Sequence, residues 1–299
     1  MDRHTLVSTV PTDHRSSQSV SNAVPAMISV LILTKNEEQD LPGCLKSVSW
    51  SDDVHVFDSC SNDRTVDIAQ QAGAHVTIRP FDGYASQRNA ALGAAFTNDW
   101  ILILDADERV PLELVTELTK RIQQAGPEVS GFRIRRRDYF NNTWLKHSQM
   151  TPFYVRLVRK GKAHYHREIN EVLQVDGTIQ DVDGYFEHYP FSKGLSHWLS
   201  KHNVYSTLEA KRWIEENSGT IEFSLKKALF SKDFGEKRYH QKGLFYKIPG
   251  RPVIKWLYMV IWRRSFLDGY AGITNATLQA IYEYFIVIKT KEMLTKRTP

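Results

Sequence analysis

The chain has 299 residues, of which 41% are hydrophobic and 24% are charged, and its formal net charge is +5. This composition excludes fibrous and wholly disordered proteins and predicts a globular one with a real core. The basic excess, 39 residues against 34, suits a phosphate-bearing substrate or an anionic membrane surface, but many enzymes carry as much without either partner. We expect no nucleic-acid partner.

The first 26 residues and the two cysteines indicate the compartment in which the protein is found. Residues 1–26 mix polar and charged residues and lack the apolar core of a signal peptide, so we expect a disordered leader. Cys44 and Cys60 offer neither a disulfide framework nor a metal-ligand spacing, which predicts a reducing compartment. No uninterrupted apolar run reaches about 18 residues, which argues against a simple membrane-spanning helix.

Strands and helices alternate in the first half of the ordered chain, which begins at Met27. The expected strands are residues 28–33, 54–57, 75–78 and 100–104. Helices are expected around residues 41–48, at 64–72 with Asn62 or Asp63 as the cap, and roughly at 84–96. This alternation predicts an α/β fold with a mostly parallel sheet and helices on both faces.

The pattern changes after about residue 130. Short strands are expected at residues 132–134, 153–158 and 172–175, and the Asp176-Gly177 pair predicts a hairpin between residues 172–175 and 178–182. We expect an antiparallel extension here and a return to helices from Leu195. The predicted domains are a catalytic domain at 27–192, divided into halves 27–130 and 131–192, and a helical C-terminal region at 193–299.

Polar residues follow three of the predicted parallel strands, where such sheets bind ligands. The first strand leads into Thr34-Lys35-Asn36-Glu37, the second into the segment from Asp58 to Thr65, and the fourth into Asp105-Ala106-Asp107-Glu108. Neither the glycine pattern of dinucleotide oxidoreductases nor a P-loop occurs, which disfavours both classes. Asp105 and Asp107 offer the carboxylates that Mg²⁺ or Mn²⁺ prefers, although such a pair is often only a surface turn or a helix cap.

Four blocks of sequence resemble one enzyme family. They are SVLILTKNEEQDLPGCLKSV, DSCSNDRTVDIAQQAGAHV, QRNAALGAA and DWILILDADERV. Residues 28–110 thereby resemble the GT-A fold of the large family of inverting glycosyltransferases that includes bacterial cell-envelope enzymes. The resemblance is strongest to lipopolysaccharide core glycosyltransferases, with which FLDGYAG near the C-terminus also matches. It implies a nucleotide-sugar donor and a bound Mg²⁺ or Mn²⁺.

The resemblance also implies roles for individual residues in donor binding. Thr34, Asn36 and Glu37 would line the nucleoside pocket, and Asp58 would accept a hydrogen bond from the base, as suits N3–H of uracil. Ser61 and Asp63 would shape the loop below, although Asp63 has the alternative of a helix cap. Arg88 would approach the ribose or diphosphate, unless it forms an ordinary surface pair. Asp107 would ligate the metal, and Asp105 would contact the ribose or share the metal. Cys60 and Asn62 depart from the Gly and Thr that are frequent in the family.

An inverting transfer needs a general base on the acceptor side. Related sequences carry a His-Glu pair before a valine-rich strand, and the alignment places Glu171 on that carboxylate, with Asn170 where His is usual. We therefore expect Glu171 to be the base, with Glu168 as its rival. The alternative is that both glutamates are solvated loop charges.

The sequence leaves open the roles of several histidines and arginines in the second half of the chain. His164, His166, His188, His197 and His202 lack zinc-ligand spacing, and we expect no zinc site. His166 and His188 are candidates to line the acceptor cleft. Arg156 and Arg159 either face an anionic substrate or lie on a solvated strand face.

Two apolar, aromatic stretches flanked by basic residues lie near the C-terminus, at 252–262 and 280–288. Each is too short to cross a bilayer but suits a helix lying in the membrane surface. The alternative is a pair of core helices.

The sequence as a whole predicts a metal-dependent, inverting transferase of a hexose from a UDP-sugar. The expected acceptor is a lipid-linked glycan or oligosaccharide such as lipopolysaccharide core, at the cytoplasmic face of the inner membrane. The alternatives are a transferase for capsule or exopolysaccharide and a catalytically silent sugar-nucleotide-binding protein. A nucleotidyltransferase is disfavoured because Thr34-Lys35-Asn36-Glu37 replaces its glycine-rich loop.

Overall fold

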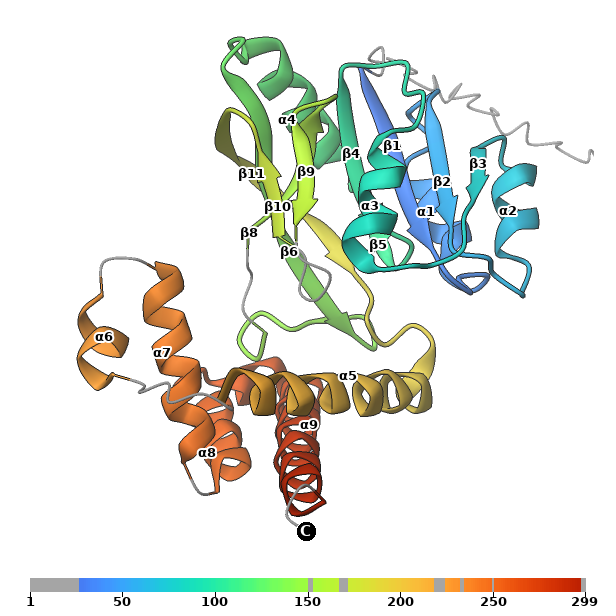
Figure 1. The fold of residues 1–299 in the computed structure, drawn as a ribbon. Coiled ribbons are helices and arrows are strands. Elements are labelled where there is room, and N and C mark those ends of the chain that lie inside the picture. Colours follow the sequence, from blue (N-terminus) through green and yellow to red (C-terminus); the bar gives the residue numbers. More distant parts are fainter. Residues whose placement is uncertain are drawn as a thin grey trace, which may run out of the picture.

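The computed structural model describes residues 27–149, 153–166, 172–217, 224–231, 234–248 and 250–296. A parallel sheet forms the first half, as predicted (Figure 1). Its strand order is β3-β2-β1-β4, with β1 paired to both β2 and β4. The bounds are β1 (Ile28–Thr34), β2 (Val54–Asp58), β3 (His75–Ile78) and β4 (Trp100–Asp105).

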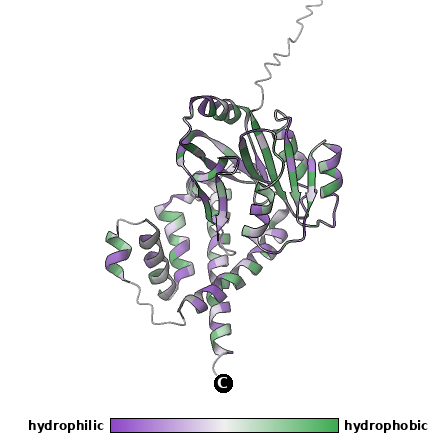
Figure 2. Ribbon diagram, turned by 45° about the horizontal axis from the view of Figure 1, so that its top comes forward, coloured by the Kyte–Doolittle hydropathy of each residue, from purple (hydrophilic) through white to green (hydrophobic). Residues whose placement is uncertain are grey.

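Both faces of this sheet are covered, which explains why β1 is mostly apolar and why its two polar residues, Ser29 and Thr34, are buried and hydrogen-bonded to Asp53 and Asp58. Val30 and Ile32 point to the cluster that contains residues of α1 (Leu41–Ser47) and α2 (Thr65–Gln71). Leu31 packs on the other face with residues of α3 (Tyr84–Leu92). Successive strand residues face opposite sides, so a strand covered on both has no polar side. Figure 2 shows hydrophobic residues along the central strands.

Two details of the helices differ from the prediction. Helix α3 ends at Leu92 rather than near residue 96, because the chain turns at Gly93, whose N–H donates to the carbonyl of Ala90. Helix α2 begins after Arg64, which makes no side-chain cap, so the predicted capping position at Asn62 or Asp63 is wrong. Asp63 lies one residue earlier and its carboxylate accepts a hydrogen bond from the N–H of Thr65.

The sheet continues through an antiparallel extension. Strand β8 runs antiparallel to β4 and to β6, β11 runs parallel to β6, and β5 closes the edge antiparallel to β11. The elements are β5 (Glu108–Arg109), α4 (Leu112–Gln124), β6 (Val129–Phe140), β7 (Thr143–Trp144), β8 (Phe153–Arg159) and β11 (Thr178–His188). The predicted mixed α/β fold is therefore confirmed.

The hairpin predicted at Asp176-Gly177 does not form. Strand β10 (Val172–Val175) pairs with β9 (Ala163–His166) in a separate sheet, whereas β11 pairs with β6. Gly177 carries the chain from one sheet to the other at φ +136°, where a side chain would come within 2.8 Å of the carbonyl of Glu128. The glycine thus permits a close crossing between sheets rather than a two-residue hairpin turn.

Helices make up the rest of the described chain. They are α5 (Gly194–Asn217), α6 (Leu225–Phe230), α7 (Phe234–Lys247), α8 (Arg251–Leu257), the π-helix η1 (Tyr258–Trp262), the 3₁₀ helix η2 (Ser265–Asp268) and α9 (Gly269–Thr295). Helix α5 crosses α9 below the sheet (Figure 1). Within the described ranges, no helix is long and apolar enough to cross a membrane.

Two contacts attach these helices to the sheet. Phe140 and Leu145 form a buried cluster with Trp198 of α5 and Leu278 of α9. Asp268 of η2 accepts hydrogen bonds from the backbone N–H groups of His147, at 2.8 Å, and Ser148, at 2.7 Å. The helical region is therefore held firmly against the segment that follows β7.

Candidate active site

A pocket of about 910 Å³ lies between the carboxyl ends of the parallel strands and the helical region. Its volume falls in the range of small-molecule binding sites. The sheet side contributes residues from the ends of β1, β2 and β4, including Thr34, Lys35, Glu37, Ser59, Cys60, Asp105 and Asp107. The opposite wall comes from α5 and α9, through Lys201, Tyr205, Leu208, Glu209, Arg212 and Tyr282.

Asp58 at the end of β2 is fully buried and organises the loop that follows it. Its carboxylate accepts hydrogen bonds from the hydroxyl of Thr34, at 2.8 Å, and from the backbone N–H and hydroxyl of Ser61, at 2.7 and 2.6 Å. The parallel register places Thr34 opposite Asp58, so this bond joins two neighbouring strand ends. Among these three residues, Thr34 lines the pocket.

The loops after β1 and β2 are tied to each other. The N–H of Asn36 donates to the Ser61 hydroxyl at 2.7 Å, and the Asn36 side-chain oxygen accepts from the N–H of Asn62 at 3.0 Å. Asp63 accepts from the N–H of Glu38 at 3.2 Å. Asn36 and Cys60 both have left-handed backbones, φ 55° and 60°, a conformation that Gly adopts with the least strain. A glycine at position 60, which the resemblance implies is frequent in the family, would adopt this backbone with less strain than Cys60.

Asp105 at the end of β4 lies between two arginines. Its carboxylate oxygens are 3.2 Å from Nη2 of Arg88 and 3.2 Å from Nη2 of Arg156. Burial would raise the pKa of Asp105, but the two guanidinium charges outweigh burial and hold it well below its usual range. Arg88 also lies over the ring of Tyr165 on β9, 5.4 Å from its centroid. Asp105 is thus a fixed negative charge.

Arg156 is buried rather than solvated, which rules out a solvated strand face as its environment. Its Nη2 lies 2.5 Å from Glu108, a fully buried carboxylate whose other oxygen accepts from the N–H of Asp105 at 3.0 Å. Burial raises the pKa of Glu108 to about 7. The sequence contained no signal for this pair, because an arginine in an alternating strand fits either face.

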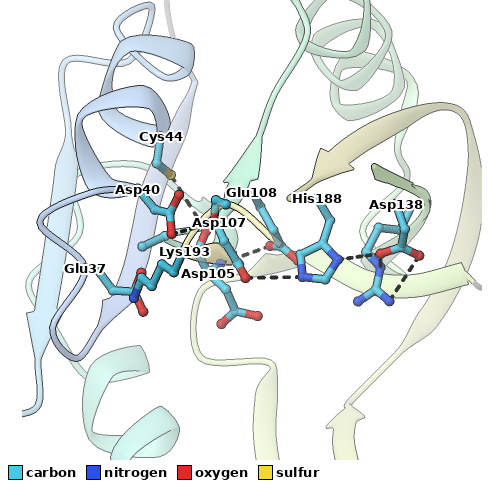
Figure 3. A network of polar contacts seen from close by, with 12 residues as sticks. Glu37, Asp40, Cys44, Asp105, Asp107, Glu108, Asp138, His188 and Lys193 are labelled. Atoms are coloured by element: carbon cyan, nitrogen blue, oxygen red, sulfur yellow. Dashed lines mark hydrogen bonds and ion pairs between the residues drawn. The ribbon is translucent and has the colours of Figure 1, made fainter. Parts of the chain in front are cut away.

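Asp107 faces His188 at the end of β11 (Figure 3). The imidazole Nε2 lies 3.3 Å from the Asp107 carboxylate, and Nδ1 bonds Asp138, which Arg136 contacts at 3.0 Å. Burial lowers the pKa of His188, but the carboxylates of Asp107 and Asp138 outweigh it and raise that pKa to about 9. The sequence suggested His188 for the acceptor cleft; the structure places it in the pocket, in contact with Asp107, which the resemblance implies as a metal ligand.

Glu37 faces the same pocket and pairs with a residue that the sequence did not single out. Its carboxylate lies 2.8 Å from Nζ of Lys193, which also donates to the carbonyl of Asn36 at 2.7 Å. Burial raises the pKa of Glu37 to about 7 despite this ion pair. Lys193 comes just before α5, so its position next to Glu37 depends on the tertiary fold.

The chemistry of these residues fits a divalent cation. Asp107 offers oxygen donors beside Asp105, and His188, whose pKa of about 9 keeps it protonated at neutral pH, would offer its Nε2 nitrogen once a metal displaces that proton; both line the pocket. A second group that could hold an ion, Asp53, His55 and His75, lies at the opposite edge of the sheet, where the strands begin. There the Asp53 carboxylate already accepts bonds from Ser29, His55 and Thr97.

The predicted base and its rival, Glu171 and Glu168, lie outside the described residues. Their role stays a prediction. Strand β9, which leads into that segment, carries Tyr165, the residue over which Arg88 lies. Arg88 in turn holds Asp105, so β9 passes beside the pocket edge.

A parallel sheet with carboxylates at the ends of β1, β2 and β4, extended by antiparallel strands, defines the GT-A class of glycosyltransferases. A sequence model described as "Glycosyl transferase family 2" matches residues 29–189, more than half of the chain. The chain belongs to this family, and the predicted resemblance is confirmed. It is accordingly a glycosyltransferase.

Three known proteins show how far the likeness extends. A lipopolysaccharide core biosynthesis glycosyltransferase of Rhizobium meliloti is 26% identical over 272 residues, which cover 88% of this chain and 91% of that protein. A TPR repeat-containing protein of Synechococcus elongatus is 41% identical over 118 residues, but the match spans only 39% of this chain and 28% of that protein. A solved mannosyltransferase of Pyrobaculum calidifontis, in complex with GDP-Man and Mn²⁺, has a TM-score of 0.52 at 14% identity, over 88% of this chain and 86% of its own. This last likeness shows the fold.

Proposed function

We propose that this glycosyltransferase moves a hexose from a UDP-sugar, with inversion, onto a lipid-linked cell-envelope glycan such as lipopolysaccharide core. The observation that carries the proposal is the Asp105-Ala106-Asp107 turn, which faces a pocket of nucleotide-sugar size. Its two carboxylates stand beside Arg88, Arg156 and His188, so cationic and anionic groups alternate where a diphosphate and a metal would lie.

The proposed metal is Mg²⁺ or Mn²⁺, held by Asp107 and His188 with Asp105 beside them. When bound, it would offset the charge that develops on the departing diphosphate. Arg88 and Arg156 already engage both oxygens of Asp105, so we assign Asp107 the stronger contact with the metal. Thr34, Asn36 and Glu37, with Ser61 and Asp63 beneath them, would form the nucleoside side of the pocket. Asp58 is fully buried beneath Thr34 and supports that side without lining the pocket, so its hydrogen bond to the nucleobase stays a prediction.

The proposed transfer is a single displacement with Glu171 as general base. An acceptor hydroxyl attacks the anomeric carbon, its proton passes to the Glu171 carboxylate, and the bond to the diphosphate breaks. Asp105, Asp107 and Glu37 lie on the donor side, which leaves proton transfer to a residue of the acceptor half.

The acceptor class is supported by the relative annotated for lipopolysaccharide core biosynthesis, at 26% identity. Capsule or exopolysaccharide is the alternative acceptor. Free Cys44 and Cys60 agree with a reducing compartment, and we propose the cytoplasmic face of the inner membrane as the place of the reaction.

A donor panel tests the proposal. Purified protein is incubated with UDP-hexoses and GDP-mannose, with EDTA or increasing Mn²⁺, and release of the nucleoside diphosphate is measured. We expect turnover of a UDP-hexose that needs Mn²⁺ or Mg²⁺, is lost in Asp107→Ala and is kept in Asp183→Ala, which removes an exposed carboxylate. Metal-independent turnover would overturn the metal assignment. Tight donor binding without turnover under every condition would favour the silent binding protein.

A further inference from the structure

Helix α8 and the following π-helix η1 expose an apolar stripe. Val253, Ile254, Leu257, Tyr258, Ile261 and Trp262 are all exposed, and they recur in pairs four residues apart, which places them along one side of the helix. Trp262 is 79% exposed. Three more exposed apolar residues follow in η2 and at the start of α9: Phe266, Leu267 and Tyr270, the last 80% exposed. We call these nine residues the α8–η2 stripe.

The stripe is not the face by which α8 joins the protein. That contact is polar and uses other residues: Arg251 Nε lies 2.8 Å from Glu283 of α9, and the Trp256 indole donates to Thr277 at 3.1 Å. Arg251, Met259, Ser265 and Asp268 are the buried residues of the segment. Val253, Ile261 and Trp262 keep most of their apolar surface exposed, and exposed apolar surface of this kind marks an interaction site.

Charge around the stripe is mostly positive. Residues 251–270 contain four basic residues and one acidic residue, Asp268, but Arg251 is buried, and Arg251 and Lys255 both pair with Glu283 of α9, which leaves Arg264 as the exposed cation. The Asp268 carboxylate is turned inward, where it accepts the N–H groups of His147 and Ser148. Arg264 is exposed next to Trp262. The surface thus combines apolar and aromatic side chains with exposed positive charge, as helices lying in a bilayer surface do.

The end of the stripe is also held rigidly on the catalytic domain. Besides Asp268, Arg263 donates from Nε to the carbonyl of His147 at 3.0 Å, and Asn275 donates to the Ser148 hydroxyl at 3.1 Å. These bonds join η2 and α9 to the segment after β7. Anything bound at the stripe would therefore be held at a fixed position relative to the sheet.

We propose that the α8–η2 stripe docks on an anionic bilayer surface, with its apolar and aromatic side chains in the headgroup region and the exposed Arg264 on a lipid phosphate. The helix lies along the surface, in keeping with the finding that no described helix meets the length and apolarity of a membrane span. Of the two apolar segments predicted near the C-terminus, residues 252–262 carry this surface. Residues 280–288 belong to α9, whose Glu283 and Ile286 are buried.

Liposome flotation of the full chain, without donor or metal, tests the proposal independently of catalysis. We expect flotation with vesicles of phosphatidylcholine and phosphatidylglycerol, weaker flotation with phosphatidylcholine alone, and loss at high salt. The double variant Ile261→Ser/Trp262→Ser should reduce the bound fraction by about tenfold or more, because it removes two of the largest exposed apolar side chains. Arg264→Gln should weaken binding to anionic vesicles only.

The matched control is Leu112→Ser, which removes a 70% exposed apolar residue from α4 and should leave flotation unchanged. Circular dichroism and thermal unfolding confirm that each variant is folded, and size-exclusion chromatography with light scattering reports the oligomeric state. Wild-type protein that stays with the soluble fraction in the presence of anionic vesicles would overturn the proposal. So would a wild-type dimer that becomes monomeric in the double variant, since the stripe would then bind a second copy.

Discussion

Arg156 on β8 lies with Nη2 3.2 Å from the carboxylate of Asp105 at the end of β4. The same nitrogen is 2.5 Å from the buried Glu108. A residue of the antiparallel extension thus holds a carboxylate of the parallel half in place and in its charged form. The side of the pocket formed by the parallel strands is therefore completed by a later strand of the chain, β8.

This contact predicts a large loss of stability when Arg156 is removed. Arg156→Ala leaves Glu108 buried without its charged partner, and we expect the free energy of unfolding to fall by about 3 to 5 kcal/mol, measured by urea denaturation. Arg133→Ala is the control, because its pair with Asp181 is exposed and should contribute about 1 kcal/mol or less. Adding Glu108→Gln to Arg156→Ala should recover part of the loss. Equal effects of the two arginine variants would contradict the assignment.

The His188–Asp138 contact predicts an effect on metal affinity. If His188 ligates the metal with Asp107, Asp138 orients the imidazole through Nδ1, and Asp138→Asn should raise the Mn²⁺ concentration for half-maximal activity by about 10 to 100-fold. His188→Ala should raise it further. The control is His75→Ala, at the opposite edge of the sheet, which should leave the Mn²⁺ titration unchanged. Unaltered metal dependence in His188→Ala would remove His188 from the site.

The raised pKa values of Glu37 and Glu108 predict that stability falls as pH rises through the weakly acidic range. An unfolded glutamate loses its proton near 4.5, whereas these two keep theirs until about pH 7 when folded. The free energy of unfolding therefore contains the full contribution of these two protonated glutamates below pH 4.5. That contribution is lost as the pH approaches 7. For Glu37 the loss is about 3 kcal/mol.

Glu37→Gln isolates that contribution because glutamine does not titrate. Urea unfolding at pH 5 and pH 7 should show a clearly smaller fall in stability for the variant than for the wild type. Glu113→Gln, on the exposed first turn of α4, should behave like the wild type. A wild-type protein that gains stability from pH 5 to pH 7 by the same amount as Glu37→Gln would refute the prediction.

If Glu171 is the general base, replacing it should slow the transfer reaction without weakening donor binding. Glu171→Gln should lower kcat by about 10² to 10⁴-fold while leaving the dissociation constant of the donor unchanged, because a general base acts on the acceptor. Glu168→Gln is the matched comparison, three residues away. Wild-type turnover in Glu171→Gln together with its loss in Glu168→Gln would transfer the role to Glu168.

Several features of this protein could be predicted because they depend on neighbours in the chain. The run from Ile28 to Leu33 is apolar at every position except Ser29, as is typical of a strand covered on both faces, and β1 forms there. Asp105 and Asp107 follow a strand of the same kind, so their place at the sheet edge was predictable too. The turn at Asp176-Gly177 shows the limit of such reasoning: its composition indicated a sharp change of direction but not which strands would pair.

The sequence by itself determined that strands and helices alternate along the first half of the chain and that Asp58, Asp105 and Asp107 lie at the carboxyl ends of its strands. It also carried the resemblance to the family. Only the tertiary structure decided that Arg156 and His188 meet those aspartates, that Lys193 pairs with Glu37, and that α5 forms the far wall of the pocket. The physical reason is range. Strand periodicity and strand-end chemistry are local, whereas ion pairs between residues about 50 to 150 positions apart form only after folding brings strands β8 and β11 and the start of α5 to the same edge.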